Sequence, residues 1–367
     1  MNGYFYVLTT IDIFVLCFMC VLTRLSESLN KKQKRGFLFA FGLIALISLL
    51  EVVTLKVDGL PKKFRWLNIV SNYLGFGLTP SVCICLVYVL DKKTKLRWEF
   101  KLAILCEIVY LLILAISIPS GLVFSVSQEN IYSRGPYFVI YIIAYFISIL
   151  YLSLSTIFVS KQFQNRSKAL IYPLMIFLVA ETIIQILVPD LHVSWLCVTL
   201  LSVLYFIYCS EMWNQLDGLT GLLNQNSFLN RSEEMNYTNG MLIVFDVDDF
   251  KRINDELGHA VGDEALWHTA DILRGVFGKD PVFLARYGGD EFAVLGDWFG
   301  QEQIEEAIAR IQEGIDRFNK EGQLPLQLSM SIGYAFWHEA GRRGENLIQQ
   351  ADERMYEEKQ KKKRMRA

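Results

Sequence analysis

Apolar residues are concentrated in the first 213 positions, where they form seven long stretches separated by short polar segments. Each stretch has about 20 residues, the length that a helix needs to cross the hydrocarbon core of a bilayer. Seven such helices in succession would be very unusual inside a water-soluble domain, so we expect an all-α membrane bundle of about seven transmembrane helices. The expected spans are Tyr4–Leu22, Phe37–Val57, Trp66–Leu90, Leu102–Phe124, Tyr137–Ser160, Ala169–Pro189 and Leu191–Trp213.

The pattern changes after residue 213, where shorter apolar runs alternate with polar segments. Met241–Val247 is continuously apolar and predicts a strand buried on both faces. Gly288 and Gly289 separate two runs rich in β-formers, which predicts a hairpin over 282–296, because both turn positions can adopt positive φ. With the helices expected around it, the order α-β-α-α-β-β-α-β-α favours an α/β domain with a central mixed sheet flanked by helices. We therefore expect two domains, residues 1–213 and 214–367.

Composition and charge support this division. The hydrophobic fraction is 53%, and the mean hydropathy of +0.30 is high for a soluble protein. Segments 23–36, 91–101 and 161–168 hold 5, 5 and 3 Lys/Arg, whereas segments 56–65 and 125–136 hold 4 and 1. By the positive-inside rule the first set is cytoplasmic, although segment 56–65 points weakly the other way. We expect the N-terminus outside and the second domain in the cytoplasm.

The polar and reactive residues of the first half leave two interpretations open. All seven cysteines lie in the expected spans, which argues against a disulfide framework or a zinc site. Ionisable groups at membrane depth suggest a functional site, but such acids could equally be hydrogen-bonded packing residues. The four acids within expected spans are Asp12, Glu51, Glu107 and Glu181. The basic run at Lys359–Arg366 is interpreted as a solvated helix end, so no nucleic-acid partner is expected.

Carboxylates mark a candidate metal site in the second half. Asp290 and Glu291 directly follow the Gly-Gly pair at the tip of the expected hairpin. Such an arrangement suits Mg²⁺, which prefers rigidly held oxygen ligands completed by substrate phosphates. Asp246 lies at the end of the expected buried strand, and Asp248 would share its face if the strand continued. Spacing alone does not decide which of the two is a ligand.

Five motifs in one order and spacing resemble the GGDEF family of diguanylate cyclases, over about residues 214–363. They are Asp217–Asn224, Phe245–Asp263, Arg286–Phe292, Ser329–Gly333 and Ala351–Lys359. The resemblance implies a membrane-bound enzyme of a bacterial-type plasma membrane that condenses two GTP into cyclic di-GMP and two pyrophosphates. It implies one GTP per domain and a homodimer for catalysis. The expected partners are thus GTP, a second copy, the lipid bilayer and a signal acting on the transmembrane region.

The resemblance also assigns roles to individual residues. Asp290 would accept the proton of the attacking hydroxyl, and Glu291 would support the site. Two Mg²⁺ (or Mn²⁺) per half-site would be held by Asp246, the Val247 carbonyl and Asp290. A carboxylate such as Asp263 can accept from both N1–H and the 2-amino group of guanine, donors that adenine lacks. The implied substrate-binding residues are Phe250, Lys251, Asn254, His259, Asp263, Gly288, Gly289, Lys359 and Lys363.

Departures from the family pattern limit these expectations. Lys363 stands where the family usually has arginine and lacks its planar two-pronged donor. Lys279-Asp280-Pro281-Val282 stands where many members carry the Arg-x-x-Asp motif of product inhibition, so we expect no product site there. The alternative function is a GGDEF-like module that binds GTP or cyclic di-GMP without turnover and transmits a membrane signal. Because no Pro/Gly/Ser linker follows Trp213, the last span is expected to continue as a helix into the second domain.

Overall fold

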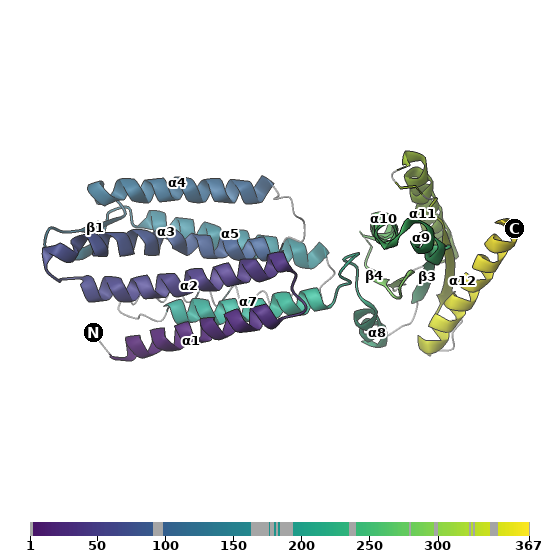
Figure 1. Ribbon diagram of the computed structural model, residues 1–367, viewed down its shortest axis with the longest axis horizontal. Helices are drawn as coiled ribbons and strands as arrows, with labels where there is room; N and C mark the ends of the chain where they lie inside the picture. The colour runs from purple at the N-terminus through teal and green to yellow at the C-terminus, as the bar shows by residue number, and fades with distance from the viewer. Residues whose placement is uncertain are drawn as a thin grey trace. The chain divides into compact units, whose positions relative to one another are not determined.

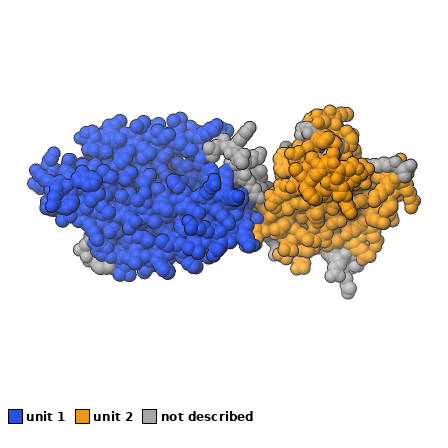
Figure 2. Space-filling model, viewed as in Figure 1, with its two compact units in different colours: residues 1–161, 165–213 blue, residues 162–164, 214–367 orange. Residues whose placement is uncertain are grey.

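The computed structural model divides the chain into two compact units, shown in Figure 2: residues 1–161 with 165–213, and residues 162–164 with 214–367. We call them the membrane unit and the GGDEF-like unit. The structure describes residues 3–90, 98–162, 176, 180, 183, 194–234, 240–278, 280–296, 300–322, 324–325, 327–337 and 344–366.

The membrane unit is a bundle of long helices that run lengthwise beside one another (Figure 1). Among the described residues, six helices are long and apolar enough to cross a membrane. The expected count of seven is therefore not confirmed, because the span expected at Ala169–Pro189 lies almost wholly outside the described residues. The helices are α1 (Gly3–Leu25), α2 (Lys31–Val57), α3 (Arg65–Leu90), α4 (Trp98–Ser120), α5 (Val139–Gln162) and α7 (Ser194–Asn214).

Polar side chains connect the helices inside this bundle. Asp12 of α1 is buried and accepts hydrogen bonds from Ser48 of α2 and Thr199 of α7. In α3 and α4, the Ser81 hydroxyl donates to the Glu107 carboxylate at 2.5 Å. Buried polar groups need such partners because water cannot solvate them there. Glu181 lies outside the described residues.

The connection between α4 and α5 forms a short hairpin that sequence patterning did not predict. Strands β1 (Phe124–Val126) and β2 (Tyr132–Arg134) pair antiparallel. Asn130 stands between them with a φ of 64°, and its side-chain amide donates to the Val57 carbonyl at 2.7 Å. The hairpin is thereby tied to the end of α2, close to the short 3₁₀ helix η1 (Lys62–Phe64).

The GGDEF-like unit has the element order that the sequence predicts. Its elements are α8 (Gln225–Glu234), β3 (Met241–Val247), α9 (Phe250–Leu257), α10 (His259–Phe277), β4 (Phe283–Arg286), β5 (Glu291–Gly296), α11 (Gln301–Glu321), β6 (Met330–Phe336) and α12 (Gly344–Arg366). The strands lie in the order β4-β5-β3-β6, and all three pairings are antiparallel. Leu223, which lies outside these strands, forms an isolated parallel bridge with Ala285 of β4.

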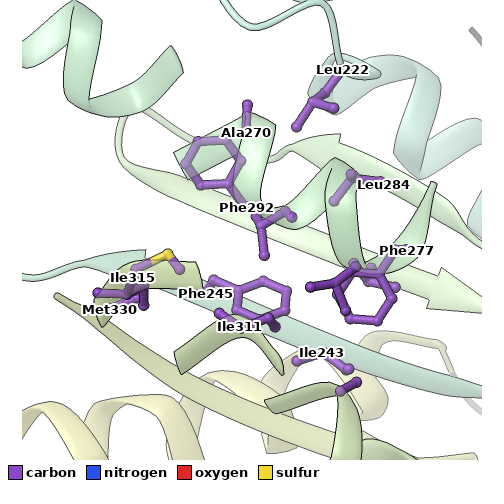
Figure 3. Packing of buried hydrophobic residues seen from close by; sticks show 14 of the residues in the cluster. Leu222, Ile243, Phe245, Ala270, Phe277, Leu284, Phe292, Ile311, Ile315 and Met330 are labelled. Atoms are coloured by element: carbon purple, nitrogen blue, oxygen red, sulfur yellow. The ribbon is translucent and has the colours of Figure 1, made fainter. Parts of the chain in front are cut away.

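Strand β3 organises this unit because it lies between β5 and β6 and is buried along its whole length. Alternate β3 residues point to opposite faces of the sheet. One set, including Ile243 and Phe245, enters the main core with residues of α10 and α11 (Figure 3). The other face is covered by α12, whose backbone lies so close to Gly333 of β6 that a Cβ there would overlap Ala351. Both faces of the sheet are therefore covered by helices.

The expected continuous helix from the last span into the second unit is wrong. Helix α7 ends at Asn214, and Leu216 pairs with Leu223 in an antiparallel bridge. The turn between them closes on Asp217, whose carboxylate accepts from the Thr220 amide and hydroxyl at 2.8 and 2.7 Å. Gly221 has a φ of 70°. These local hydrogen bonds compete with helical ones and stop the helix.

Candidate active site

The end of β3 and the tip of the β4–β5 hairpin bring the expected metal and catalytic residues together. Asp246 is the register partner of Glu291, and the Val247 amide donates to the Asp290 carbonyl at 3.1 Å. The pairing of β3 with β5 thus places both hairpin acids beside Asp246. Sequence spacing predicted each acid separately, and the strand register joins them.

Asp246 and Lys359 form an ion pair at the centre of this cluster. The Lys359 Nζ lies 2.5 Å from the Asp246 Oδ1. Burial raises the pKa of the Asp246 carboxyl, and the nearby Asp290 and Asp248 add to this, while the Lys359 charge opposes it. Burial also raises the pKa of Glu291, helped by the charges of Asp246 and Asp352. Negative charge therefore exceeds positive charge in this cluster, which favours an added cation.

Asp248 has a different environment from Asp246. Its carboxylate accepts hydrogen bonds from Ser329 at 2.5 Å and Ser331 at 2.6 Å, and its amide donates to the Ser329 carbonyl. These contacts attach the end of β3 to the beginning of β6. Asp248 is 7% exposed, so its oxygens are occupied in holding the sheet together.

The side chains at this site supply only part of the ligand set that Mg²⁺ needs. Among the described residues, no three His, Cys, Asp or Glu side chains gather closely enough to hold a metal ion. Asp246, Asp290 and the backbone carbonyl of Val247 nevertheless offer the oxygen ligands that Mg²⁺ prefers, and Mg²⁺ commonly completes its shell with water and substrate phosphates. The Lys359 ammonium already lies beside the Asp246 carboxylate and donates a hydrogen bond to it. The residues present therefore fit a metal that arrives with its substrate.

The turn after β3 has the geometry of an anion site. Asp249 has a φ of 55° and a ψ of 25° and makes no side-chain cap for α9, which begins at Phe250. A non-glycine residue in this conformation is uncommon and is enriched where function imposes strain. Without a cap, the first amides of α9 remain available to an anion. Phe250 packs partly against the core, and Lys251 is exposed.

The expected guanine-reading residues lie around the junction of α9 and α10. A Cβ at Gly262 would overlap the Asn254 side chain, so Asn254 lies directly against the first turn of α10. His259 and Asp263 are exposed in that turn. Gly258, with a φ of 88°, makes the sharp connection between the two helices. Asn254 and Asp263 are therefore presented from adjacent turns of two successive helices.

The glycines of the hairpin serve a purpose other than the expected one. Neither Gly288 nor Gly289 has a positive φ. At Gly288, a Cβ would come within 2.6 Å of the Glu291 carboxylate, whereas at Gly289 it would meet nothing within 4 Å. The amides of Tyr287 and Gly288 both donate to the Glu291 carbonyl, at 2.8 and 3.1 Å. The first glycine makes room for the acid, and the second leaves open space at the tip.

Arg286 and Asp217 hold the hairpin tip, and the sequence analysis did not single out this pair. The Arg286 guanidinium donates to the Asp217 carboxylate at 3.2 Å and to the Gly289 carbonyl at 2.6 Å. Burial opposes ionisation of Asp217, but the hydrogen bonds of Thr220 and the charge of Arg286 outweigh it and lower the pKa of Asp217. The sequence signal for this turn was Asp217, an acid three residues before Thr220, because such a side chain can accept hydrogen bonds from the turn that follows it.

Helix α12 presents Lys362 to the site as well as Lys359. The Lys362 Nζ donates to the Met330 carbonyl at 2.5 Å and lies 3.9 Å from the Asp248 carboxylate. Lys363, which the sequence predicts as a substrate-binding residue, is exposed. Lys362 and Lys363 follow Lys359 by three and four residues, so both lie on the side of α12 that carries Lys359. Lys279 lies outside the described residues. Val282, which stands where many family members carry the Asp of the product-binding motif, is buried.

Comparisons with known proteins agree on the second unit. Residues 214–365 match the family "Diguanylate cyclase, GGDEF domain". Over 156 residues the chain is 37% identical to the probable diguanylate cyclase DgcI of Escherichia coli K12, covering 42% of this chain and 33% of that protein. It is 32% identical over 151 residues to the probable diguanylate cyclase DgcT of the same organism, with 39% and 33% covered. The chain therefore matches about a third of the length of these relatives.

Among solved structures, the chain is similar to the GGDEF domain of DgcB from Caulobacter crescentus in complex with c-di-GMP. That chain is 28% identical, with 40% of this chain and 90% of that chain covered and a TM-score of 0.36.

Proposed function

Residues 214–365 are a GGDEF domain, and we propose that this domain is an active diguanylate cyclase that condenses two GTP into cyclic di-GMP and two pyrophosphates. The observation that carries the proposal is the meeting of Asp246, Asp290 and Glu291 beside Lys359. A domain that only bound nucleotide would not need partly buried Asp290 and Glu291 beside buried Asp246, because it is costly to hold like charges together away from water. Surplus negative charge next to an open anion site is what a metal-dependent phosphoryl transfer requires.

Each half-site would bind one GTP through residues of three elements. The first amides of α9 and the side chain of Lys251 would hold the terminal phosphates. Lys359 would exchange its contact with Asp246 for one with a phosphate oxygen, since both are anionic acceptors. Asp263 would accept from the N1–H and 2-amino groups of guanine, and the Asn254 amide would form a further hydrogen bond with the base. Gly289 leaves the hairpin tip open to the nucleotide.

The reaction joins two such half-sites. The 3′-hydroxyl of one GTP attacks the α-phosphorus of the other, and pyrophosphate leaves from the opposite side. Asp290 would take the proton of that hydroxyl, and Glu291 would support its position. Mg²⁺ bound by Asp246, Asp290 and the Val247 carbonyl would neutralise phosphate charge and favour ionisation of the hydroxyl. A second copy of the chain is required because one domain holds one substrate.

The six apolar helices would anchor the enzyme in a bacterial-type plasma membrane, with the N-terminus outside and the GGDEF domain in the cytoplasm. The distribution of Lys and Arg among the loops supports this orientation. The membrane unit would then regulate how two GGDEF domains meet. A signal could act on the membrane unit without entering the cytoplasm.

The proposal is tested by incubating the full chain in nanodiscs with GTP and Mg²⁺ and measuring cyclic di-GMP by chromatography. Asp290→Ala is expected to lower turnover on the order of 10²–10⁴-fold, the usual contribution of a general base. Glu306→Ala, at an exposed acid on α11, is the matched control and should be neutral. Nucleotide binding without product in the wild type would identify the domain as a binding module instead.

Guanine selection is tested separately. Asp263→Ala removes a charge-assisted hydrogen bond worth ~1.5–3 kcal/mol, so KM for GTP should rise about 10- to 100-fold with little change in kcat. The neighbouring exposed acid Glu264 provides the control variant Glu264→Ala. Wild-type KM and continued exclusion of ATP in Asp263→Ala would show that the base is read by other residues.

A further inference from the structure

An open cavity of about 480 Å³ lies among α2, α3 and α4 of the membrane unit, and its wall includes the exposed side chains of Phe39 and Ile108. This volume is in the range of small-molecule sites, which are mostly apolar with a few well-placed polar groups. Its wall has that composition. The apolar lining includes Phe39, Ile84, Phe100, Ile104 and Ile108, and the polar lining consists of Arg35, Ser81 and Glu107.

The two ends of this cavity differ chemically. The rings of Tyr88 and Phe100 lie 5.8 Å apart and mark one end. Ser81 precedes Tyr88 by seven residues on α3, and Glu107 follows Phe100 by seven residues on α4, so each lies roughly 10 Å further along its helix. The Ser81 hydroxyl and the Glu107 carboxyl are hydrogen-bonded to each other at 2.5 Å. The far end is thus a single polar pair.

Arg35 belongs to the aromatic end. The next residue, Gly36, packs so closely on α3 that a Cβ there would lie 3.2 Å from the Tyr88 ring and 2.7 Å from Val89. Arg35 lines the cavity, and it has no hydrogen bond or ion pair with any part of the chain that the structure describes. The Lys32 ammonium lies 4.7 Å from the centre of the Tyr88 ring. This end therefore offers positive charge to a ligand.

We propose that this cavity binds a single-chain aliphatic carboxylate with a hydroxyl group near its far end, the class of medium-chain hydroxy fatty acids. The carboxylate pairs with the Arg35 guanidinium, whose planar donors match it. The aliphatic body fills the roughly 10 Å between the two ends, and the hydroxyl joins the Ser81–Glu107 pair. A cationic ligand would be repelled by Arg35.

The site is tested by direct binding, which does not depend on cyclase activity. The full chain in phosphatidylcholine nanodiscs is titrated with ω-hydroxydecanoic acid by calorimetry. Saturable binding with one ligand per chain is expected, and Arg35→Gln should weaken it about tenfold or more. Lys31→Gln is the control, because Lys31 is an exposed cation one turn earlier on α2 that does not line the cavity. It should bind as the wild type does.

The far end is tested by comparing ω-hydroxydecanoic with decanoic acid. The wild type should prefer the hydroxylated ligand several-fold, and Ser81→Ala should remove that preference while leaving the binding of decanoic acid unchanged. Ile104→Trp, which fills the cavity between its two ends, should abolish the binding of both. Its thermal unfolding in the nanodisc is compared with that of the wild type.

The proposal is overturned if binding does not saturate, or if Arg35→Gln and Lys31→Gln have the same affinity. It is also overturned if phosphatidylglycerol in the nanodisc displaces the ligand completely, since the cavity would then belong to a membrane lipid. Unchanged affinity in a folded Ile104→Trp variant would place the ligand elsewhere. If that variant does not fold, the comparison of Arg35→Gln with Lys31→Gln still tests the proposal.

Discussion

The two units place their large apolar side chains in opposite ways. In the membrane unit, helix α1 directs Phe14 outward with 73% of its surface exposed. In the GGDEF domain, Phe277 of α10 is fully buried in the core beneath the sheet. Outward phenylalanines would be a liability in water but suit a hydrocarbon surrounding. The comparison shows that the same residue type stabilises one unit through its interior and fits the other to its solvent.

Carboxylates differ between the units in a similar way. In the membrane unit, buried Asp12 is satisfied by the hydroxyls of Ser48 and Thr199. In the GGDEF domain, Asp217 and Asp246 have cations as partners, Arg286 and Lys359. Hydroxyl partners allow a carboxyl group to remain neutral, whereas a cation stabilises its ionised form. Asp12 of the membrane unit therefore has partners that carry no charge, whereas Asp217 and Asp246 of the GGDEF domain form ion pairs.

The largest expected effect contrasts the two phenylalanines. Phe277→Ala should lower the unfolding free energy of the GGDEF domain by ~3–5 kcal/mol, because it removes a buried ring and leaves a cavity. Phe14→Ala should change the stability of the membrane unit by less than ~0.5 kcal/mol. Calorimetry of the full chain in nanodiscs measures both transitions. A large loss of stability in Phe14→Ala would show that this ring packs on protein rather than facing lipid.

A second test concerns the ion-paired carboxylate. The folded-state pKa of Asp217 is below its usual value, so its stabilising contribution is present above about pH 4 and is lost as the pH falls through the folded-state pKa. Asp217→Asn should therefore lower stability at pH 7 by ~1.5–3 kcal/mol, and the difference from wild type should shrink below about pH 4. Asp271→Asn, in an exposed ion pair with Arg274, is the control. A pH-independent difference would mean that the charge is not involved.

The smallest expected effect concerns Asp12. Thr199→Val removes one of its hydroxyl donors and should cost only ~0.6 kcal/mol, the average for hydrogen bonds between helices in a membrane. Thr10→Val, at an exposed threonine of α1, is the control. Thermal unfolding in nanodiscs gives the difference. A cost of several kcal/mol would indicate an ionised Asp12.

A change of basal cyclase output in Asp12→Asn, at unchanged protein level, would favour a sensing role over packing.

Sequence patterning predicted those features that follow from local periodicity. Met241–Val247 is apolar without interruption and forms the central strand, and the runs around Gly288 form the hairpin. It did not predict what depends on contacts across the fold. The fixing of Arg286 by Asp217 joins residues far apart in sequence. The contact of Lys362 with the Met330 carbonyl depends on the rotation of α12 on the sheet.

Two local expectations failed for related physical reasons. The hairpin glycines were assigned to a backbone requirement, but the bulk of the Glu291 side chain explains Gly288 instead. The apolar run to Trp213 gave no sign of a helix end, because the turn that stops α7 depends on the side chain of Asp217. At both places the local backbone depends on the contacts of one side chain, Glu291 or Asp217. The spacing of apolar residues along the sequence carries no information about such contacts.

The position of β3 has a consequence for how the GGDEF domain would respond to heat. Amide protons exchange most slowly in the best-covered parts of a fold, and exposed turns open first. Asp246 lies on a strand paired on both sides and buried throughout, whereas Asp290 follows the exposed Gly289 at a hairpin tip. On mild warming the tip should therefore open while β3 stays closed. The proposed cyclase activity would then disappear before the domain unfolds and return on cooling.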